Sequence, residues 1–236
     1  MASHEKKRRL CECDLALAAT MADEEELRRF ILRFLTGRPY PFYRSAKSLI
    51  PSILSIMSLV LIPSEATLKK AIARKCKKGR VGEVPGNQKI VAALREYAIA
   101  HKVTGVEFQH DKVPLGKAGL RQFWSPFIIE IDGKKYIPYF DPRLDWQLSP
   151  EARRFVFSVN HTYIRAADPA LFSDVGFAIF QFKKKADGSR EIIVHFDDGV
   201  ELWTDKEIGK MVDALFRMIE AVEAERATPD EKKKAG

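Results

Sequence analysis

The sequence has few cysteines and lacks several motifs that carry familiar catalytic chemistry. Cys11, Cys13 and Cys76 stand at spacings that suit neither a set of disulfides nor a zinc site. Free thiols are typical of a reducing compartment, so we expect a cytoplasmic protein. The chain also lacks a P-loop, a nucleophile elbow, an HExxH pair and a zinc finger. Without such a motif, His161 and His195 are more easily explained as structural residues than as catalytic ones.

A long hydrophobic run is missing as well. Residues 48–64 are uncharged, but this stretch of seventeen residues is short for a membrane-spanning helix, which needs about 20. Near the N-terminus, Glu12 and Asp14 interrupt the apolar stretch that a secretory signal would require. We therefore expect no transmembrane span. Residues 48–63 are interpreted as a buried helix or a docking segment, and the alternative is a membrane-associated or partner-binding patch.

Positive charge is concentrated in one part of the chain. Residues 67–121 carry 13 Lys and Arg against 4 Asp and Glu, a net charge of +9, whereas the whole chain carries +8. Such a segment is typical of proteins that contact polyanions, although it is also compatible with a solvated surface. The first interpretation predicts contacts with the backbone of a nucleic acid, DNA or RNA. The residues expected to make them are Lys69, Lys70, Arg74, Lys75, Lys77, Lys78 and Arg80.

Hydrophobic periodicity and capping residues predict a mixed α+β protein. The expected elements are a helix at 88–100, strands at 105–109, 123–131 and 135–140, a helix at 150–167, strands at 175–182 and 191–196 and a helix at 205–225. The core order is therefore α-β-β-β-α-β, followed by an added hairpin and a C-terminal helix. A helical region is expected to precede this core.

Domain boundaries are expected where the composition changes. Residues 1–22 are interpreted as a mobile N-terminal arm and residues 23–85 as a helical, basic N-terminal region. Residues 86–226 are expected to form the α/β core domain. The polar and charged residues 227–236 are expected to be a disordered tail.

The order of elements in residues 87–182 resembles the core of the PD-(D/E)xK nuclease superfamily. In that family an Asp on the second strand and an acid-x-Lys motif on the third hold a divalent metal beside the scissile phosphate. Here Asp132 ends the second strand, and the triplet Asp141-Pro-Arg143 ends the third nine residues later. Arg143 stands where the family has its lysine. Glu96, on the first helix, matches an additional acid that many members carry there.

The resemblance implies metal-dependent phosphodiester cleavage, or a relative that has lost catalysis and still binds nucleic acid. Asp132 and Asp141 would be oxygen ligands of Mg²⁺. Arg143 would stabilise charge on the phosphoryl group in the transition state. This interpretation requires the three side chains to converge in one cleft beside residues 69–80.

The competing interpretation is a non-enzymatic protein that binds another protein. In this case residues 48–63 and the C-terminal helix would dock the partner, and the basic segment would be a solvated surface. Asp132 precedes Gly133, a pair typical of a two-residue hairpin turn. A docking protein would therefore leave Asp132 at an exposed hairpin tip, away from other carboxylates.

Overall fold

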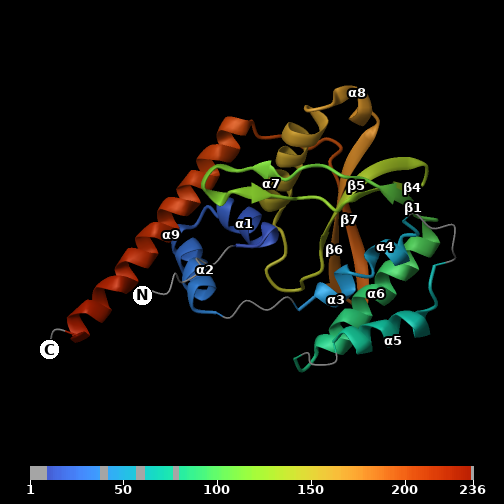
Figure 1. Ribbon diagram of the computed structural model, residues 1–236, viewed down its shortest axis with the longest axis horizontal. Coiled ribbons are helices and arrows are strands. Elements are labelled where there is room, and N and C mark those ends of the chain that lie inside the picture. The colour runs from blue at the N-terminus through green and yellow to red at the C-terminus, as the bar shows by residue number, and fades with distance from the viewer. Residues whose placement is uncertain (1–9, 38–41, 57–61, 77–79, 235–236) are drawn as a thin grey trace.

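The computed structural model describes residues 10–37, 42–56, 62–76 and 80–234 (Figure 1). The helices are α1 (Glu12–Ala19), α2 (Glu24–Thr36), α3 (Arg44–Lys47), α4 (Ile50–Ile53), α5 (Glu65–Lys75), α6 (Glu83–Ala100), α7 (Pro150–Asn160), α8 (Pro169–Phe172) and α9 (Asp205–Lys234). The strands are β1 (Thr104–Glu107), β2 (Val113–Pro114), β3 (Leu120–Arg121), β4 (Phe127–Ile131), β5 (Lys134–Asp141), β6 (Val175–Lys184) and β7 (Arg190–Phe196). The mixed α+β class expected from the sequence is confirmed.

One five-stranded sheet organises the molecule, with the strand order β1-β4-β5-β6-β7. Strands β5 and β6 are parallel, and the other neighbouring pairs are antiparallel. A parallel pair needs a crossover connection, and α7 lies within it. The expected order of helix, three strands, helix and strand is therefore present as α6, β1, β4, β5, α7 and β6. The small β2–β3 hairpin is an insertion between β1 and β4.

The two faces of the sheet are covered by different helices. Side chains alternate along a strand, so Tyr139 of β5 and Phe177 of β6 face one hydrophobic cluster, which includes residues of α1, α2, α7 and α9. Phe140 is one position after Tyr139 and Phe180 is three positions after Phe177, so both point to the other face. There they contact a second cluster, which includes residues of α4, α5 and α6. Figure 1 shows these two helical layers on either side of the strands. Each strand of the central pair thus contributes to both cores.

The N-terminal residues differ from the mobile arm that the composition suggested. Helix α1 is part of the first core, where Leu15 and Ala16 have no exposed surface. The helix has only 8 residues, so packing rather than intrinsic helix propensity must stabilise it. At the other end of the chain, α9 continues to Lys234 and includes most of the segment expected to be disordered.

Helix α6 begins earlier than its sequence suggested. A helix at 88–100 was expected, but α6 starts at Glu83, and Asn87 is fully buried within it. Asn87 Oδ1 accepts a hydrogen bond from the backbone N of Ala46 at 2.8 Å, and its Nδ2 donates to the carbonyl oxygen of Phe42 at 2.7 Å. The Asn87 side chain therefore connects α6 to α3 through these hydrogen bonds. Across the described residues, no helix is long and apolar enough to span a bilayer.

Candidate functional site

The carboxylate of Asp141, at the end of β5, has no exposed surface. Its Oδ1 accepts a hydrogen bond from Arg143 Nε at 2.7 Å, and its Oδ2 accepts one from the backbone N of Leu148 at 2.9 Å. Buried polar groups are normally satisfied in this way. Because both oxygens are used within the chain, Asp141 closes the loop between β5 and α7.

Arg143 connects this loop to α1. Its Nη1 donates to Asp14 Oδ1 at 2.8 Å, while the side chain remains only 18% exposed. Burial alone would lower the pKa of Arg143, but Cys13, Asp141 and Asp14 raise the pKa overall. The guanidinium therefore stays charged between two carboxylates, an arrangement that holds α1 against the end of β5.

A buried thiol and a phenol extend the same cluster. Cys13 Sγ lies 2.9 Å from the hydroxyl of Tyr139, and both side chains belong to the first core. Burial raises the pKa of Tyr139 well above its usual range, so the phenol stays neutral. Sequence reasoning missed this contact because it treated the whole segment before residue 23 as mobile. The uninterrupted apolar run from Leu15 to Ala19 was the available signal.

Asp132 lies far from this cluster, in the turn between β4 and β5. Its φ is 49° and its side chain is 68% exposed, with Oδ2 3.0 Å from His101 Nδ1. Asp132 precedes β5 and Asp141 ends it, so roughly 25 Å of strand separates them. The physical reason is that β4 and β5 are antiparallel, and residues that end successive antiparallel strands lie at opposite ends of the sheet.

Glu96 is also separate from the other acids. It lies on α6 and lines a hollow of about 510 Å³ together with Glu65, Arg95 and Ile99. Within the described residues, no group of three or more His, Cys, Asp or Glu side chains is arranged to hold a metal ion. The geometry on which the Mg²⁺ expectation depended is therefore not formed in the described part of the chain.

The basic side chains lie on the opposite side of the sheet from Asp141. Lys69, Lys70, Arg74 and Lys75 are exposed on α5, which packs against α6 in the second layer. Lys69 forms an ion pair with Glu65 at 2.6 Å, one helical turn earlier. Arg80 is exposed just before α6, whereas Lys77 and Lys78 lie outside the described residues. The predicted cleft between these cations and the acids is thus not formed.

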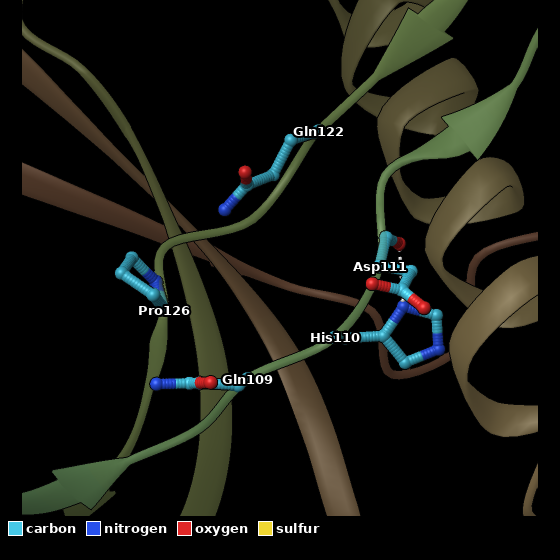
Figure 2. Close-up of a pocket in the computed structure, with 5 residues that line it drawn as sticks. All are labelled: Gln109, His110, Asp111, Gln122 and Pro126. Carbon is cyan, nitrogen blue, oxygen red and sulfur yellow. Dashed lines mark hydrogen bonds between the residues drawn. The ribbon is translucent and has the colours of Figure 1, made fainter.

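A second hollow, of about 520 Å³, is lined by polar side chains from two loops. Figure 2 shows Gln122 reaching toward its middle, with His110 and Asp111 on one side and Gln109 and Pro126 on the other. His110 Nδ1 donates to the carbonyl oxygen of Asp111 at 2.8 Å, and Gln122 Nε2 donates to that of Trp124. These lining groups offer hydrogen bonds but contain no nucleophile placed beside a base.

A partly buried cluster of His161, Arg165 and Asp197 at the end of α7 was not predicted. His161 Nε2 lies 2.6 Å from Asp197 Oδ2, and Arg165 Nη2 lies 3.4 Å from the same oxygen. Residues His161–Arg165 form a π-helical turn, and Arg165 Nη1 lies 3.2 Å from His161 Nδ1. Burial would raise the pKa of Asp197, but hydrogen bonds from His161 and the backbone N of Phe177 lower it overall. The cluster ties α7 to the ends of β6 and β7.

Comparison with known proteins identifies a family. The model of the family described as "Sliding clamp-binding bacterial toxin SocB" matches residues 13–229. The chain is also similar to the "DNA replication inhibitor toxin SocB" of Caulobacter vibrioides (strain NA1000 / CB15N), with 25% identity over 231 residues, 98% of this chain and 96% of the relative. No solved structure matches the chain.

These findings correct two sequence-based interpretations. The resemblance to the PD-(D/E)xK nucleases is wrong, because the matching family is a different one and Asp132 and Asp141 lie at opposite ends of β5. The main functional interpretation, a nuclease-like protein that binds nucleic acid, is overturned by the same match, which favours the competing protein-binding interpretation. The family match covers most of the 236 residues, and on this basis the chain belongs to the SocB family of sliding clamp-binding bacterial toxins.

Proposed function

We propose that this chain is a toxin that binds a sliding clamp and inhibits DNA replication. The observation that carries the proposal is the family match over residues 13–229, supported by the Caulobacter relative whose name states replication inhibition. The alignment extends over nearly all of both chains, so the relative has no large additional domain that could hold the activity. A replication target also gives the protein a cytoplasmic site of action.

The physical basis would be binding without a chemical step. A protein that occupies the surface on which a clamp receives its other partners lowers the concentration of clamp available to them, by mass action. Inhibition should then depend on the ratio of toxin to clamp. It should also need no metal or cofactor, since no bond is broken.

A reconstituted DNA synthesis reaction tests this proposal. Purified protein should bind the purified clamp in a titration and should stop synthesis that depends on the clamp. Additional clamp should restore that synthesis, and a polymerase reaction run without a clamp should be unaffected. Inhibition that persists in the reaction without a clamp, or an absence of binding, would contradict the proposal.

Residues 48–63 are the segment that we propose for part of this contact. The support is their lack of charge over a stretch that is rich in Leu and Ile. Ile50, Ile53 and Leu54 are buried in the second core and anchor the start of the segment, whereas residues 57–61 lie outside the described residues. The C-terminal helix is less suitable than expected, because the apolar side chains of α9 are buried against the first core.

The variant Leu59→Asp tests the contribution of the segment. A charge placed in an apolar contact should weaken clamp binding strongly, because the carboxylate would be desolvated without a partner. The matched control is Val81→Asp, which adds the same charge at a fully exposed apolar residue. Equal clamp affinity for both variants, with both folded by circular dichroism, would remove residues 48–63 from the contact.

A further inference from the structure

The loop between β5 and α7 exposes two large apolar side chains. Leu144 is 37% exposed and Trp146 is 38% exposed, although they are only two positions apart. Trp146 has a φ of 57°, in the left-handed region that bulky residues rarely adopt. Such a conformation persists only where the surrounding structure enforces it, and it is frequent at sites that bind ligands.

A buried network enforces the shape of this loop from its C-terminal end. Gln147 Nε2 donates to the carbonyl oxygens of Arg143 and Phe182, the second at 2.7 Å. The carbonyl oxygen of Leu148 accepts from Arg153 Nη1 and from Gln181 Nε2, both at 3.0 Å. Together with the buried Asp141 carboxylate, which holds the backbone N of Leu148, these bonds fix both ends of the loop. The exposed tip is therefore presented on a rigid base.

Helix α2 fixes the orientation of the indole. The ring of Trp146 lies 5.5 Å from that of Phe30, and the guanidinium carbon of Arg33 lies 5.4 Å from the Trp146 ring centroid. Trp and Arg are enriched among the residues that dominate the energy of protein interfaces. A side chain that is already ordered loses little entropy on binding, which favours affinity.

The loop is connected to the chain that leads into residues 48–63. Arg190 is buried, and its Nη1 donates to the carbonyl oxygen of Pro142 at 2.8 Å while its Nη2 donates to the hydroxyl of Tyr43 at 3.2 Å. Tyr43 immediately precedes α3, and α4 follows within the proposed docking segment. The connection between β5 and α7 passes between α2 and α3 in Figure 1. Arg190 thus holds the loop beside the chain that enters α3.

We infer that Leu144, Trp146 and Arg33 make a second contact with the sliding clamp, an inference that rests on the proposed function. Leu144 and Trp146 enter an apolar recess on the clamp. Exposed Arg33 lies beside the Trp146 ring, so the part of the recess rim that faces Arg33 carries a carboxylate. The loop that presents these side chains consists of residues 141–148.

The decisive variant is Trp146→Gly in the full-length protein, titrated against the purified clamp. Glycine adopts the left-handed conformation without strain, so the loop keeps its backbone while the ring is lost. We expect the dissociation constant to rise about 30-fold, which is the effect of losing an interface hot spot. Trp146→Phe should restore part of the affinity, and Leu144→Ala should weaken binding in the same direction. The control is Leu171→Ala on α8, where a leucine is 64% exposed at a distance from the loop (Figure 1).

The outcomes separate the inference from the proposed function. If the wild-type protein does not bind the clamp, the proposed function fails. If the wild-type protein binds and folded Trp146→Gly binds with equal affinity, only the inference is overturned. It is also overturned if Trp146→Gly changes self-association in sedimentation while clamp affinity stays constant, because the loop would then contact a second copy of the chain. Loss of clamp binding in Trp146→Gly and Leu144→Ala, with Leu171→Ala unchanged, supports it.

Discussion

Asp132 and Asp141 carry the same side chain, but their environments are opposite. Asp141 is fully buried and partly neutralises Arg143, whereas Asp132 is exposed in a hairpin turn. The substitution Asp141→Asn should lower the free energy of unfolding by about 3 kcal/mol, because it leaves the guanidinium short of a counter-charge in a buried site. Asp132→Asn should remain within the small range of ordinary surface substitutions, since Asn also tolerates a positive φ.

Urea unfolding of the two variants measures this difference. Both substitutions remove one carboxylate, so a general effect of net charge would appear equally in each. Equal losses of stability would show that the Asp141 cluster contributes nothing specific.

Asp197 should make stability depend on pH in the acid range. Its pKa in the folded protein lies below the ordinary value of 3.8, so its charge stabilises the native state above that pH. This contribution is lost as the pH falls through the lowered pKa. Asp197→Asn should therefore destabilise the protein at neutral pH, and its difference from the wild type should shrink as the pH falls below 3.8.

Urea midpoints measured across this range provide the test. Asp198→Asn is the matched control, because it changes the adjacent and exposed acid. A difference for Asp197→Asn that stays constant with pH would contradict the lowered pKa.

Among the secondary structure elements, β1 depends on the close packing of Ile56 against Gly105. Ile56 lies within the proposed docking segment, residues 48–63. Ile56 forms a parallel bridge with Gly105, and a Cβ at Gly105 would collide with the Ile56 side chain and approach the carbonyl oxygen of Ile128 to 2.8 Å. Gly105→Ala should destabilise the protein by about 1–3 kcal/mol through overpacking. The bridge that fixes Ile56 should loosen with it.

A second glycine provides the control in thermal melts. Gly209 lies in α9 with open space around its Cα, so Gly209→Ala should stabilise the helix by about 0.5–1 kcal/mol. Opposite shifts in melting temperature are expected. A neutral Gly105→Ala would mean that Ile56 can move away without cost.

For the whole molecule, the shared sheet predicts a single unfolding transition. Strands β5 and β6 supply side chains to both cores, so neither helical layer can separate without exposing the other face. Ile31→Ala in the first core and Ile72→Ala in the second remove side chains with almost no exposed surface, and each should cost about 2–5 kcal/mol. Both should shift the same transition.

Two probes can separate one transition from two. Trp124 belongs to the first core and Trp203 packs against it, so their fluorescence reports this layer, whereas far-ultraviolet circular dichroism reports all helices. The two curves should coincide in both variants. Curves that separate would indicate that the two helical layers unfold independently.

The sequence by itself determined most elements of the sheet and the helices next to it. Periods of two and of 3.6 residues and the Asp132-Gly133 turn act over short distances, so they can be read locally. The same is true of Ser149, the N-cap of α7, whose side chain accepts a hydrogen bond from the backbone N of Ala152. The same local patterns identified residues 48–63 as an apolar segment without charge, and the protein-binding alternative followed from it. Family membership came from comparison over residues 13–229, which no short motif in the chain revealed.

Only the tertiary structure decided how the side chains combine. The antiparallel pairing of β4 and β5 separates Asp132 from Asp141. From the sequence, where they are nine residues apart, the two were expected to share one metal site. Arg143 meets Asp14 across 129 positions, and the 8-residue α1 is stable because the first core buries it. Interaction energies depend on distance in space and on burial, neither of which is a property of a local sequence pattern. The exposed Trp146 on its rigid loop is a product of the same folding, since bonds from β6 and α7 fix the loop that presents it.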